Sequence, residues 1–178
     1  VICVVHGHGG QAVMDAYSAS GNLKWARQEP QLGTGHAVMQ ALPELVDAGQ
    51  TLILYGDVPL IKVSTLRRLQ QAAGGGLAVL TVCLDDPSGY GRIIRQGGEI
   101  VSIVEHRDAS PEQLSVQEVN TGIMCIATPL LKGWLDRLGN DNAQGEYYLT
   151  DIIALAVEDG VKVSSAMPDA IWETLGVN

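Results

Sequence analysis

The stretch Thr51-Leu52-Ile53-Leu54-Tyr55-Gly56-Asp57-Val58-Pro59-Leu60 decides how the whole sequence is interpreted. Its first five residues form a short, mostly apolar run, which is typical of a buried strand. Pro59 favours a turn, and residues 64–72 then repeat apolar side chains at helical spacing. A buried strand followed by a turn and a helix is the repeating unit of an α/β domain.

An acidic residue, Asp57, stands where this strand is expected to end. Ligands of open α/β sheets bind beyond the carboxyl ends of the strands, and an ionised carboxylate near a core must be paired or solvated. Asp57 is therefore a candidate ligand of Mg²⁺, which prefers hard oxygen donors. Gly56 leaves space beside it. The alternative is an aspartate that only stabilises the turn.

The alternation of strands and helices extends outward from this stretch. Strands are expected at residues 2–5, 23–26 and 77–84, and helices at 11–17, 37–45 and 64–72. This order predicts one α/β domain with a mostly parallel, Rossmann-like sheet of the nucleotidyltransferase type, covered by helices on both faces.

The second half of the sequence has a different pattern. Gln96-Gly97-Gly98 lies between two apolar segments and indicates a β-hairpin, so we expect an antiparallel insertion. Further elements are expected as a strand at residues 116–126, a helix at 146–158 and a strand at 161–164.

Composition excludes several classes of protein. The 178 residues carry a formal net charge of −9 without a visible basic patch, which argues against binding to duplex nucleic acid. No apolar run approaches the length of a membrane span. Three cysteines without metal-ligand spacing indicate free thiols in a reducing cytoplasm. An anionic substrate would need a metal ion or local cations.

Two glycine-rich segments are candidate ligand loops. Residues 7–12 match G-x-G-x-x-A, which leaves open a dinucleotide-binding site, although Glu29 is a poor candidate for the ribose-binding acid. Gly33-Thr34-Gly35 precedes a helical pattern, with Thr34 as its expected cap. Glycines there let a ligand approach the backbone, and the amide of Gln28 can pair with the edge of a base. A simple glycine-flanked cap is the alternative.

Further polar groups occur in the antiparallel half, at Gly91, Glu105 and Asn120. Carboxylates, amides and glycine backbones suit the hydroxyl groups of a sugar, although each residue alone could belong to a turn. The sequence offers no Ser-His-Asp order and no G-x-S-x-G motif that would supply a nucleophile. Direct transfer assisted by a metal is therefore favoured over covalent catalysis.

Several strings, taken together, resemble those of the bacterial N-acetylglucosamine-1-phosphate uridyltransferases. The matching strings are HGHGG at residues 6–10, QLGTGHA at 31–37, LYGDVPL at 54–60, DPSGYGRI at 86–93, IVEH at 103–106, VNTG at 119–122 and NAQGEYYLTDII at 142–153. Gly-Thr-Gly and Gly-Asp-Val-Pro occur widely among nucleotidyltransferases, whereas the last string is more particular to this family.

The resemblance implies a role for each matching residue. The uracil would be held by Gln28, Gly33 and Thr34, and the ribose and N-acetylglucosamine by Tyr55, Gly56, Gly91, Glu105 and Asn120. Asp57, with Asn178 as second ligand, would bind Mg²⁺ and act in catalysis.

The activity implied is transfer of uridylyl from UTP to N-acetylglucosamine 1-phosphate, which gives UDP-N-acetylglucosamine and pyrophosphate. The chain opens at Val1 in mid-strand, so residues 1–178 are expected to be a partial uridyltransferase domain. It would lack the family's glycine-rich loop and its C-terminal acetyltransferase β-helix. By itself it is expected to be inactive, and the full-length family enzyme is expected to be a homotrimer.

Three alternatives remain at this point. A related nucleotidyltransferase could use another sugar phosphate or cytidine. A dinucleotide-binding oxidoreductase would use residues 7–12. A sugar-nucleotide sensor would bind its ligand without turnover.

Overall fold

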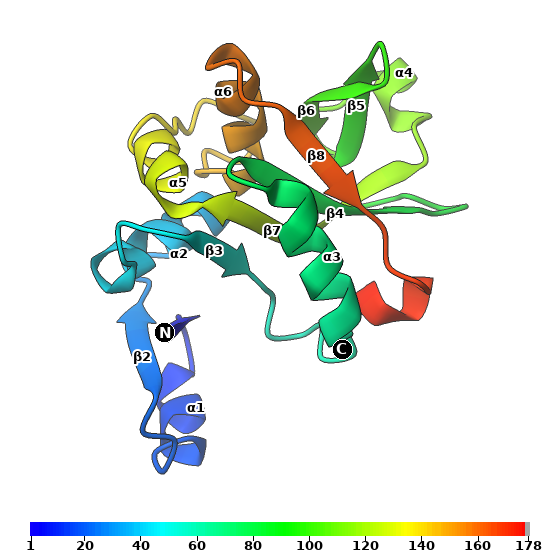
Figure 1. Cartoon of the computed structure of the whole chain (residues 1–178). Coiled ribbons are helices and arrows are strands. Elements are labelled where there is room, and N and C mark those ends of the chain that lie inside the picture. Colours follow the sequence, from blue (N-terminus) through cyan, green and yellow to red (C-terminus); the bar gives the residue numbers. More distant parts are fainter. Residues whose placement is uncertain (177–178) are drawn as a thin grey trace.

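Strands and helices alternate through the first half of the chain, as the sequence pattern predicts. The computed structural model describes residues 1–176 (Figure 1). The elements of this half are β1 (Ile2–His6), α1 (Gly10–Ala16), β2 (Leu23–Arg27), α2 (Thr34–Ala41), η1 (Leu42–Glu44), β3 (Gln50–Ile53), α3 (Val63–Ala73) and β4 (Leu77–Cys83).

The second half contains the predicted hairpin and a long strand. Its elements are β5 (Arg92–Gln96), β6 (Glu99–Val104), α4 (Pro111–Leu114), β7 (Glu118–Ala127), α5 (Thr128–Leu135), η2 (Leu149–Asp151), α6 (Ile152–Glu158), β8 (Val163–Ala166) and η3 (Ile171–Thr174). The β5–β6 hairpin turns at two glycines with positive φ, Gly97 and Gly98. None of the helices in residues 1–176 is long and apolar enough to span a membrane.

The α/β class is confirmed, but the pairing of the strands differs from a mostly parallel sheet. β1 and β2 form a parallel pair, and β4 pairs in parallel with β8. β7 runs antiparallel to β3, β4 and β5. The strand–helix–strand order did predict that β3 and β4 run in the same direction. It could not predict that β7 lies between them, because that pairing joins segments far apart in the sequence.

Helices cover both faces of the larger sheet, as expected. On β4, Leu77 and Val79 belong to the core shared with α5 and α6, which includes the buried Trp134. The alternate residues Ala78 and Leu80 face a second core with Leu69 of α3. Successive side chains of β4 thus point alternately into the two cores, as in any strand that is buried on both faces. Figure 1 shows α3 crossing one face of the sheet, with α5 and α6 beside the strands at another side.

A bulge in β7 shapes the middle of the sheet. The register between β4 and β7 shifts between Val79 and Thr81. At the same level Gly122 has φ +83°, and the Thr121 hydroxyl donates to the Leu80 carbonyl at 2.8 Å. Bulges re-aim side chains and are frequent beside functional sites. Here the bulge lies next to Asn120, one of the predicted sugar-binding residues.

Candidate functional site

A cavity of about 290 Å³ collects most of the predicted sugar-binding residues. Tyr55, Gly91, Glu105 and Asn120 line it, whereas Gly56 is not among its lining residues. Thr34, which was predicted to hold the uracil, lines the same cavity. These five lining residues come from α2, from the segment after β3, and from the antiparallel part of the sheet. Residues far apart in the sequence therefore meet in one concave site. A few convergent polar groups in such a cavity are typical of small-molecule sites.

Glu105 supplies the carboxylate of this cavity. The Thr150 hydroxyl donates to Glu105 Oε1 at 2.9 Å, which fixes the orientation of the carboxylate. Gly91 leaves the carboxylate accessible, since a Cβ at that position would lie 3.4 Å from both of its oxygens and 3.0 Å from Ile103 Cγ2. The carboxylate can therefore accept hydrogen bonds from ligand hydroxyl or amide groups.

Asn120 supplies an amide from the bulged part of β7. Its side chain is almost buried, and its Oδ1 accepts a hydrogen bond from the Gly122 backbone N–H at 3.0 Å. The Asn120 N–H donates to the Gly91 carbonyl at 2.9 Å, which ties β7 to the start of β5. Because Oδ1 is engaged, the amide NH₂ is the group that can donate to a ligand.

Tyr55 closes the cavity on the side of β3. Gly122 makes room for its ring, because a Cβ on Gly122 would lie only 2.4 Å from Tyr55 Cε2. Burial, followed by the charges of Glu105 and Asp57, raises the pKa of Tyr55 above its ordinary value. The phenol therefore stays protonated at neutral pH and can act as a hydrogen-bond donor.

Thr34 is held by a segment distant in sequence rather than acting as a helix cap. Gly33 is the N-cap residue of α2, and Thr34 is its first helical residue. The Thr34 hydroxyl accepts a hydrogen bond from the Leu149 backbone N–H at 3.0 Å. A hydroxyl that accepts in this way keeps its own proton for a ligand acceptor. The predicted cap is thus wrong, but Thr34 still presents a polar group to the cavity.

The glycines around Thr34 are required by packing against Tyr147. A Cβ on Gly33 would lie 2.7 Å from the Tyr147 carbonyl oxygen, and one on Gly35 would lie 2.9 Å from the same atom. The Gly35 N–H donates to that carbonyl at 2.7 Å, and the Tyr147 N–H donates to the Leu32 carbonyl at 2.8 Å. These bonds hold residues 146–148 outside a helix, so the helix predicted from residue 146 begins only after this segment.

Gln28 lies at a second, larger cavity of about 760 Å³. Its Nε2 donates to the Gly33 carbonyl at 2.9 Å and lies 3.2 Å from His36 Nδ1. This contact links the second cavity to the loop that carries Thr34. Gly33, the third residue predicted to hold the uracil, is not among the lining residues of either cavity. Its carbonyl accepts from Gln28, and its Cα lies close to the Tyr147 backbone.

The glycine-rich segment at residues 7–12 lines the same larger cavity with its first five residues. Two of its glycines are close to neighbouring side chains: a Cβ on Gly7 would lie 1.9 Å from Gln31 Nε2, and one on Gly10 would lie 2.0 Å from His6 Nδ1. Gly9 has φ +74°, the left-handed region that favours glycine. Glu29 is paired with Arg27 at 2.6 Å. The segment is therefore a packed glycine turn, and these contacts give no support to a dinucleotide fingerprint.

Asp57 follows Tyr55, a lining residue of the smaller cavity, by two positions and lies next to the C-terminal segment. It is exposed, and its side chain has no hydrogen bond or ion pair to any of residues 1–176. Gly56 is exposed as well and leaves open space, since a Cβ there would meet nothing within 4 Å. Gly176 passes close by, because a Cβ on it would lie 3.5 Å from Asp57 Oδ2. The other predicted metal ligand, Asn178, lies outside the described residues.

Sequence reasoning missed two residues that support this site. Thr150 holds Glu105, and the buried Glu173 holds the segment that leads to Gly176. Thr150 lies inside the string 142–153, but nothing local marks it as a partner of Glu105. Both contacts join residues that are at least 45 positions apart, so only the fold reveals them.

An α/β sheet with a polar cavity and an exposed carboxylate after a strand is consistent with a nucleotidyltransferase domain. The profile of the MobA-like NTP transferase domain matches residues 1–132. This match covers well over half of the chain, so the chain belongs to the MobA-like NTP transferase family.

Close relatives agree with the resemblance seen in the sequence strings. The chain is 64% identical over 179 residues to the bifunctional protein GlmU of Aromatoleum aromaticum and 61% identical over 178 residues to that of Dechloromonas aromatica. Each alignment covers 99% of this chain and 39% of the relative. The chain therefore spans about two fifths of the length of these curated relatives, and the family resemblance is confirmed.

Solved structures confirm the fold. A UDP-glucose pyrophosphorylase complexed with UDP-glucose superposes with a TM-score of 0.69 at 16% identity, covering 93% of this chain and 72% of that chain. A putative glucose-1-phosphate thymidylyltransferase from Bacillus anthracis gives a TM-score of 0.68 at 20% identity, covering 93% and 67%. At these identities the similarity concerns the fold alone.

Proposed function

We propose that this chain is part of an enzyme that transfers uridylyl from UTP to N-acetylglucosamine 1-phosphate, with UDP-N-acetylglucosamine and pyrophosphate as products. The observation that carries the proposal is the convergence of Thr34, Tyr55, Gly91, Glu105 and Asn120 on one cavity beside Asp57. The cavity offers a carboxylate, an amide and two hydroxyls, which suit a sugar that bears hydroxyl groups and an acetamido group.

The reaction needs little from protein acids and bases. A phosphate oxygen of the sugar phosphate attacks the α-phosphorus of UTP in line, a new P–O bond forms, and the bond to the leaving pyrophosphate breaks. The attacking oxygen is already ionised, so no general base is required. The protein contributes by holding the reactants in position and by stabilising negative charge.

Uracil recognition is proposed at Gln28, with the backbone of Gly33 and with Thr34 beside it. One proton of the Gln28 amide is used by the Gly33 carbonyl, and the nitrogen also lies 3.2 Å from His36 Nδ1. This leaves the amide oxygen to accept from the N3–H of uracil. Cytosine has an acceptor at N3, so this arrangement favours UTP over CTP.

Asp57 is the proposed Mg²⁺ ligand, together with Asn178. Mg²⁺ is commonly held by one or two carboxylates and the phosphates of the substrate. An exposed carboxylate with no protein partner among residues 1–176, beside a glycine, fits that chemistry. Bound Mg²⁺ would supply positive charge to the reacting phosphate oxygens. Within the described part of the chain, neither lysine nor arginine lines the smaller cavity.

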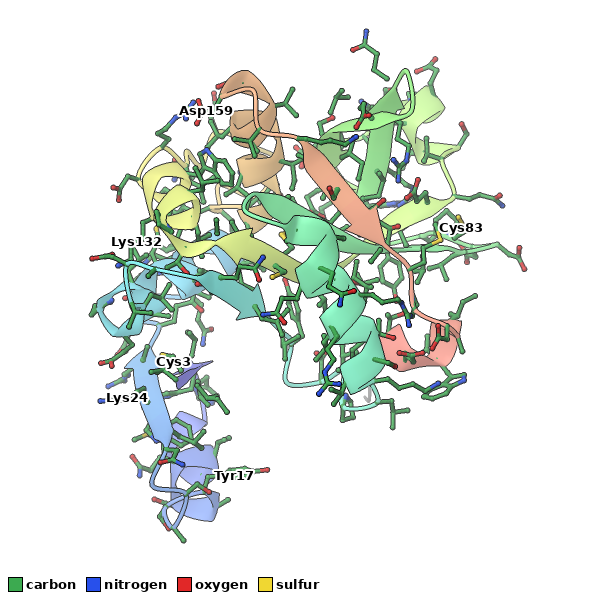
Figure 2. All side chains as sticks on the ribbon, in the orientation of Figure 1. Cys3, Tyr17, Lys24, Cys83, Lys132 and Asp159 are labelled. Carbon is green, nitrogen blue, oxygen red and sulfur yellow. The ribbon has the colours of Figure 1, made fainter. Side chains whose placement is uncertain are left out.

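The setting of the domain is also part of the proposal. Residues 1–178 would be a partial uridyltransferase domain in a longer bifunctional protein, which the 39% coverage of the relatives supports. That protein would be a cytoplasmic homotrimer. The three cysteines of residues 1–178 are free, in keeping with a reducing compartment. Figure 2 shows Cys3 and Cys83 in separate parts of the molecule.

Ligand binding tests the choice of substrate in the complete gene product. UDP-N-acetylglucosamine is expected to raise the melting temperature by several degrees, because a ligand at a hundred times its Kd stabilises by about 2.7 kcal/mol. UDP-glucose should give a smaller shift, since it lacks the acetamido group. NADH should give none. Equal shifts with UDP-glucose, or a shift with NADH alone, would contradict the proposal.

Replacing Thr150 with valine tests the role of Glu105. The change keeps the side-chain volume but removes the hydroxyl that donates to Glu105 at 2.9 Å. We expect the KM for the sugar phosphate to rise roughly tenfold, since a hydrogen bond to a charged group contributes about 1.5–3 kcal/mol. Steady-state kinetics measure this. Thr150→Ser should restore most of the affinity, and a valine variant with unchanged KM would rule out this role.

A further inference from the structure

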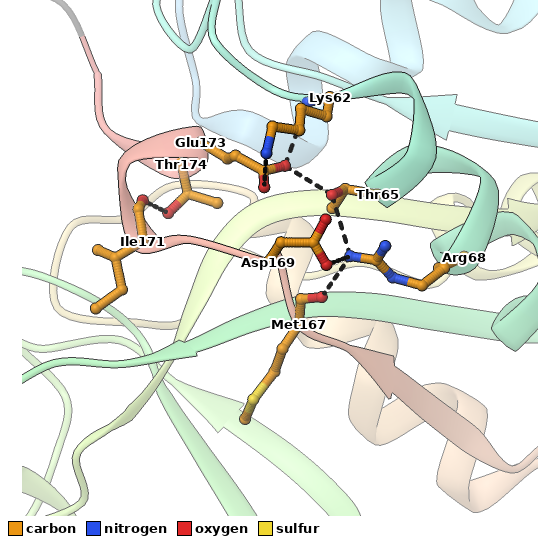
Figure 3. A network of polar contacts seen from close by, with 8 residues as sticks. All are labelled: Lys62, Thr65, Arg68, Met167, Asp169, Ile171, Glu173 and Thr174. Carbon is orange, nitrogen blue, oxygen red and sulfur yellow. Dashed lines mark hydrogen bonds and ion pairs between the residues drawn. The ribbon is translucent and has the colours of Figure 1, made fainter.

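Glu173 is a fully buried carboxylate outside both cavities. Its Oε2 accepts a hydrogen bond from the Thr65 hydroxyl at 2.6 Å and one from the Lys62 backbone N–H at 3.3 Å. Its Oε1 lies 3.6 Å from Lys62 Nζ. These contacts join η3, near the C-terminal end, to the first turn of α3 (Figure 3).

A second set of contacts surrounds this carboxylate. Arg68 Nη2 donates to the Thr65 hydroxyl at 3.2 Å and to the Met167 carbonyl at 3.3 Å, and it forms an ion pair with Asp169 Oδ1 at 2.9 Å. Lys62 Nζ also lies 4.7 Å from the centre of the Trp172 ring. Figure 3 shows the side chains of Thr65, Arg68 and Asp169, with Lys62 and Glu173 beside them, between α3 and the chain that follows β8. We call this set, Lys62, Thr65, Arg68, Asp169 and Glu173, the Glu173 network.

The Glu173 network lies between two segments that meet at Asp57. The loop 57–61 leads directly into α3, whose N-cap residue is Lys62. The segment after Glu173 reaches Gly176, where a Cβ would lie 3.5 Å from Asp57 Oδ2. Glu173 therefore connects two segments that lie next to Asp57: the loop 57–61, which follows it, and residues 174–176, which pass beside it.

We propose that Glu173 is a positioning residue for the cation site of the transfer reaction, because it holds the segment 167–176 against α3 and so sets the position of Asp57. Glu173 touches neither cavity, and it acts through Asp57 and the neighbouring backbone. This inference rests on the proposed function. It adds a residue that neither the sequence strings nor the sugar-binding cavity indicates.

The choice of a carboxylate supports a positioning role. A buried charge costs free energy unless it is paired and hydrogen-bonded, and an apolar residue would fill the same space more simply. Burial alone would raise the pKa of Glu173, but the hydrogen bonds from Thr65 and Lys62 and the charge of Lys62 outweigh it and lower the pKa. The carboxylate is thus charged at neutral pH, and its directional bonds run from its own segment to Lys62 and Thr65 at the start of α3.

The test uses Glu173→Gln and Lys62→Met in the complete gene product. The first change keeps the shape of the Glu173 side chain but removes its charge, and the second removes the ammonium group at the partly exposed end of the pair. We expect Mn²⁺, used as the probe in the presence of UTP and followed by electron paramagnetic resonance, to bind roughly tenfold more weakly to Glu173→Gln. Lys62→Met should show a smaller change in the same direction.

Two further readouts separate positioning from general destabilisation. Amide hydrogen exchange should become faster in peptides that cover residues 55–61 and 167–176. The KM for the sugar phosphate should stay unchanged, because Glu105 and Asn120 belong to a different part of the site. Glu99→Gln is the matched control, since Glu99 also pairs with a lysine, Lys162, at 3.0 Å but on the exposed surface.

The outcomes are distinct. Folded variants that bind Mn²⁺ as tightly as the wild type would overturn the inference, and Glu173 would then be a purely structural residue. If Glu173→Gln does not fold, Lys62→Met takes its place in the test. A folded Lys62→Met variant with the Mn²⁺ affinity of the wild type would then overturn the inference. A wild-type protein that transfers no uridylyl group contradicts the proposed function itself.

Discussion

Replacing Asp57 with asparagine is expected to remove nearly all turnover while the fold is retained. The carboxylate is exposed and makes no bond to residues 1–176, so its loss should change the free energy of unfolding by less than about 0.5 kcal/mol. Turnover should fall by about 10²–10³-fold, the effect of removing one electrostatic contact to a transition state. Steady-state rates and thermal unfolding measure the two effects separately.

Asp136→Asn is the matched control for this substitution. Asp136 is also exposed, at the end of α5, and the change alters the net charge by the same amount. Its turnover should equal that of the wild type. If Asp57→Asn keeps near-normal turnover with the same dependence on Mg²⁺, the assignment of Asp57 as a metal ligand is wrong.

Replacing Gly33 with alanine is expected to damage both stability and substrate binding. Gly33 has φ +102°, a region that residues with a Cβ rarely adopt, and a Cβ would lie 2.7 Å from the Tyr147 carbonyl oxygen. The backbone strain alone costs about 1–3 kcal/mol. Thermal unfolding should show a melting temperature lower by several degrees, at roughly 2–4 °C per kcal/mol for a domain of this size.

The same change should weaken binding of both substrates, because Gly33 connects Gln28 to Thr34. Gly21→Ala is the control: a Cβ at Gly21 would meet nothing within 4 Å, and its φ is not in the left-handed region. That variant should be as stable as the wild type or slightly more stable. If Gly33→Ala melts like Gly21→Ala, Tyr147 does not require a glycine at this position.

The sequence predicted those features that depend on neighbouring residues. The apolar run before Gly56 predicted a strand, and β3 covers its first three residues. The burial expected for this strand is wrong, because no residue of β3 is buried and Leu52 and Leu54 are exposed. The glycines after Gln96 predicted the β5–β6 hairpin. In each case the signal lies within about ten residues, where periodicity and turn chemistry determine the local structure.

The features that were missed depend on contacts between distant segments. Residues 146–148 have a helical pattern but are not helical, because Tyr147 pairs with Leu32 and Gly35. Thr34 was expected to cap its helix and instead binds Leu149. A local pattern carries no information on such partners, and tertiary contacts override helix propensity.

The residues predicted to bind the substrates are divided between two cavities, which the sequence did not predict. Five of the predicted substrate-binding residues share one cavity, whereas Gln28 lies at the other, joined to the first through Gly33 and Thr34. Gln28 and Thr34, both predicted to hold the uracil, therefore line different cavities. The strings alone could not show this, since they give the order along the chain and not the position in space.

Transfer of a labelled phosphorus atom tests the proposed reaction most directly. The complete gene product would be incubated with UTP labelled at the α-phosphorus, N-acetylglucosamine 1-phosphate and Mg²⁺, and the products separated. We predict that the label appears in UDP-N-acetylglucosamine, that pyrophosphate is released without label, and that omission of the sugar phosphate abolishes both. Release of labelled UMP in place of the sugar nucleotide, or transfer that requires a different sugar phosphate, would contradict the proposed activity.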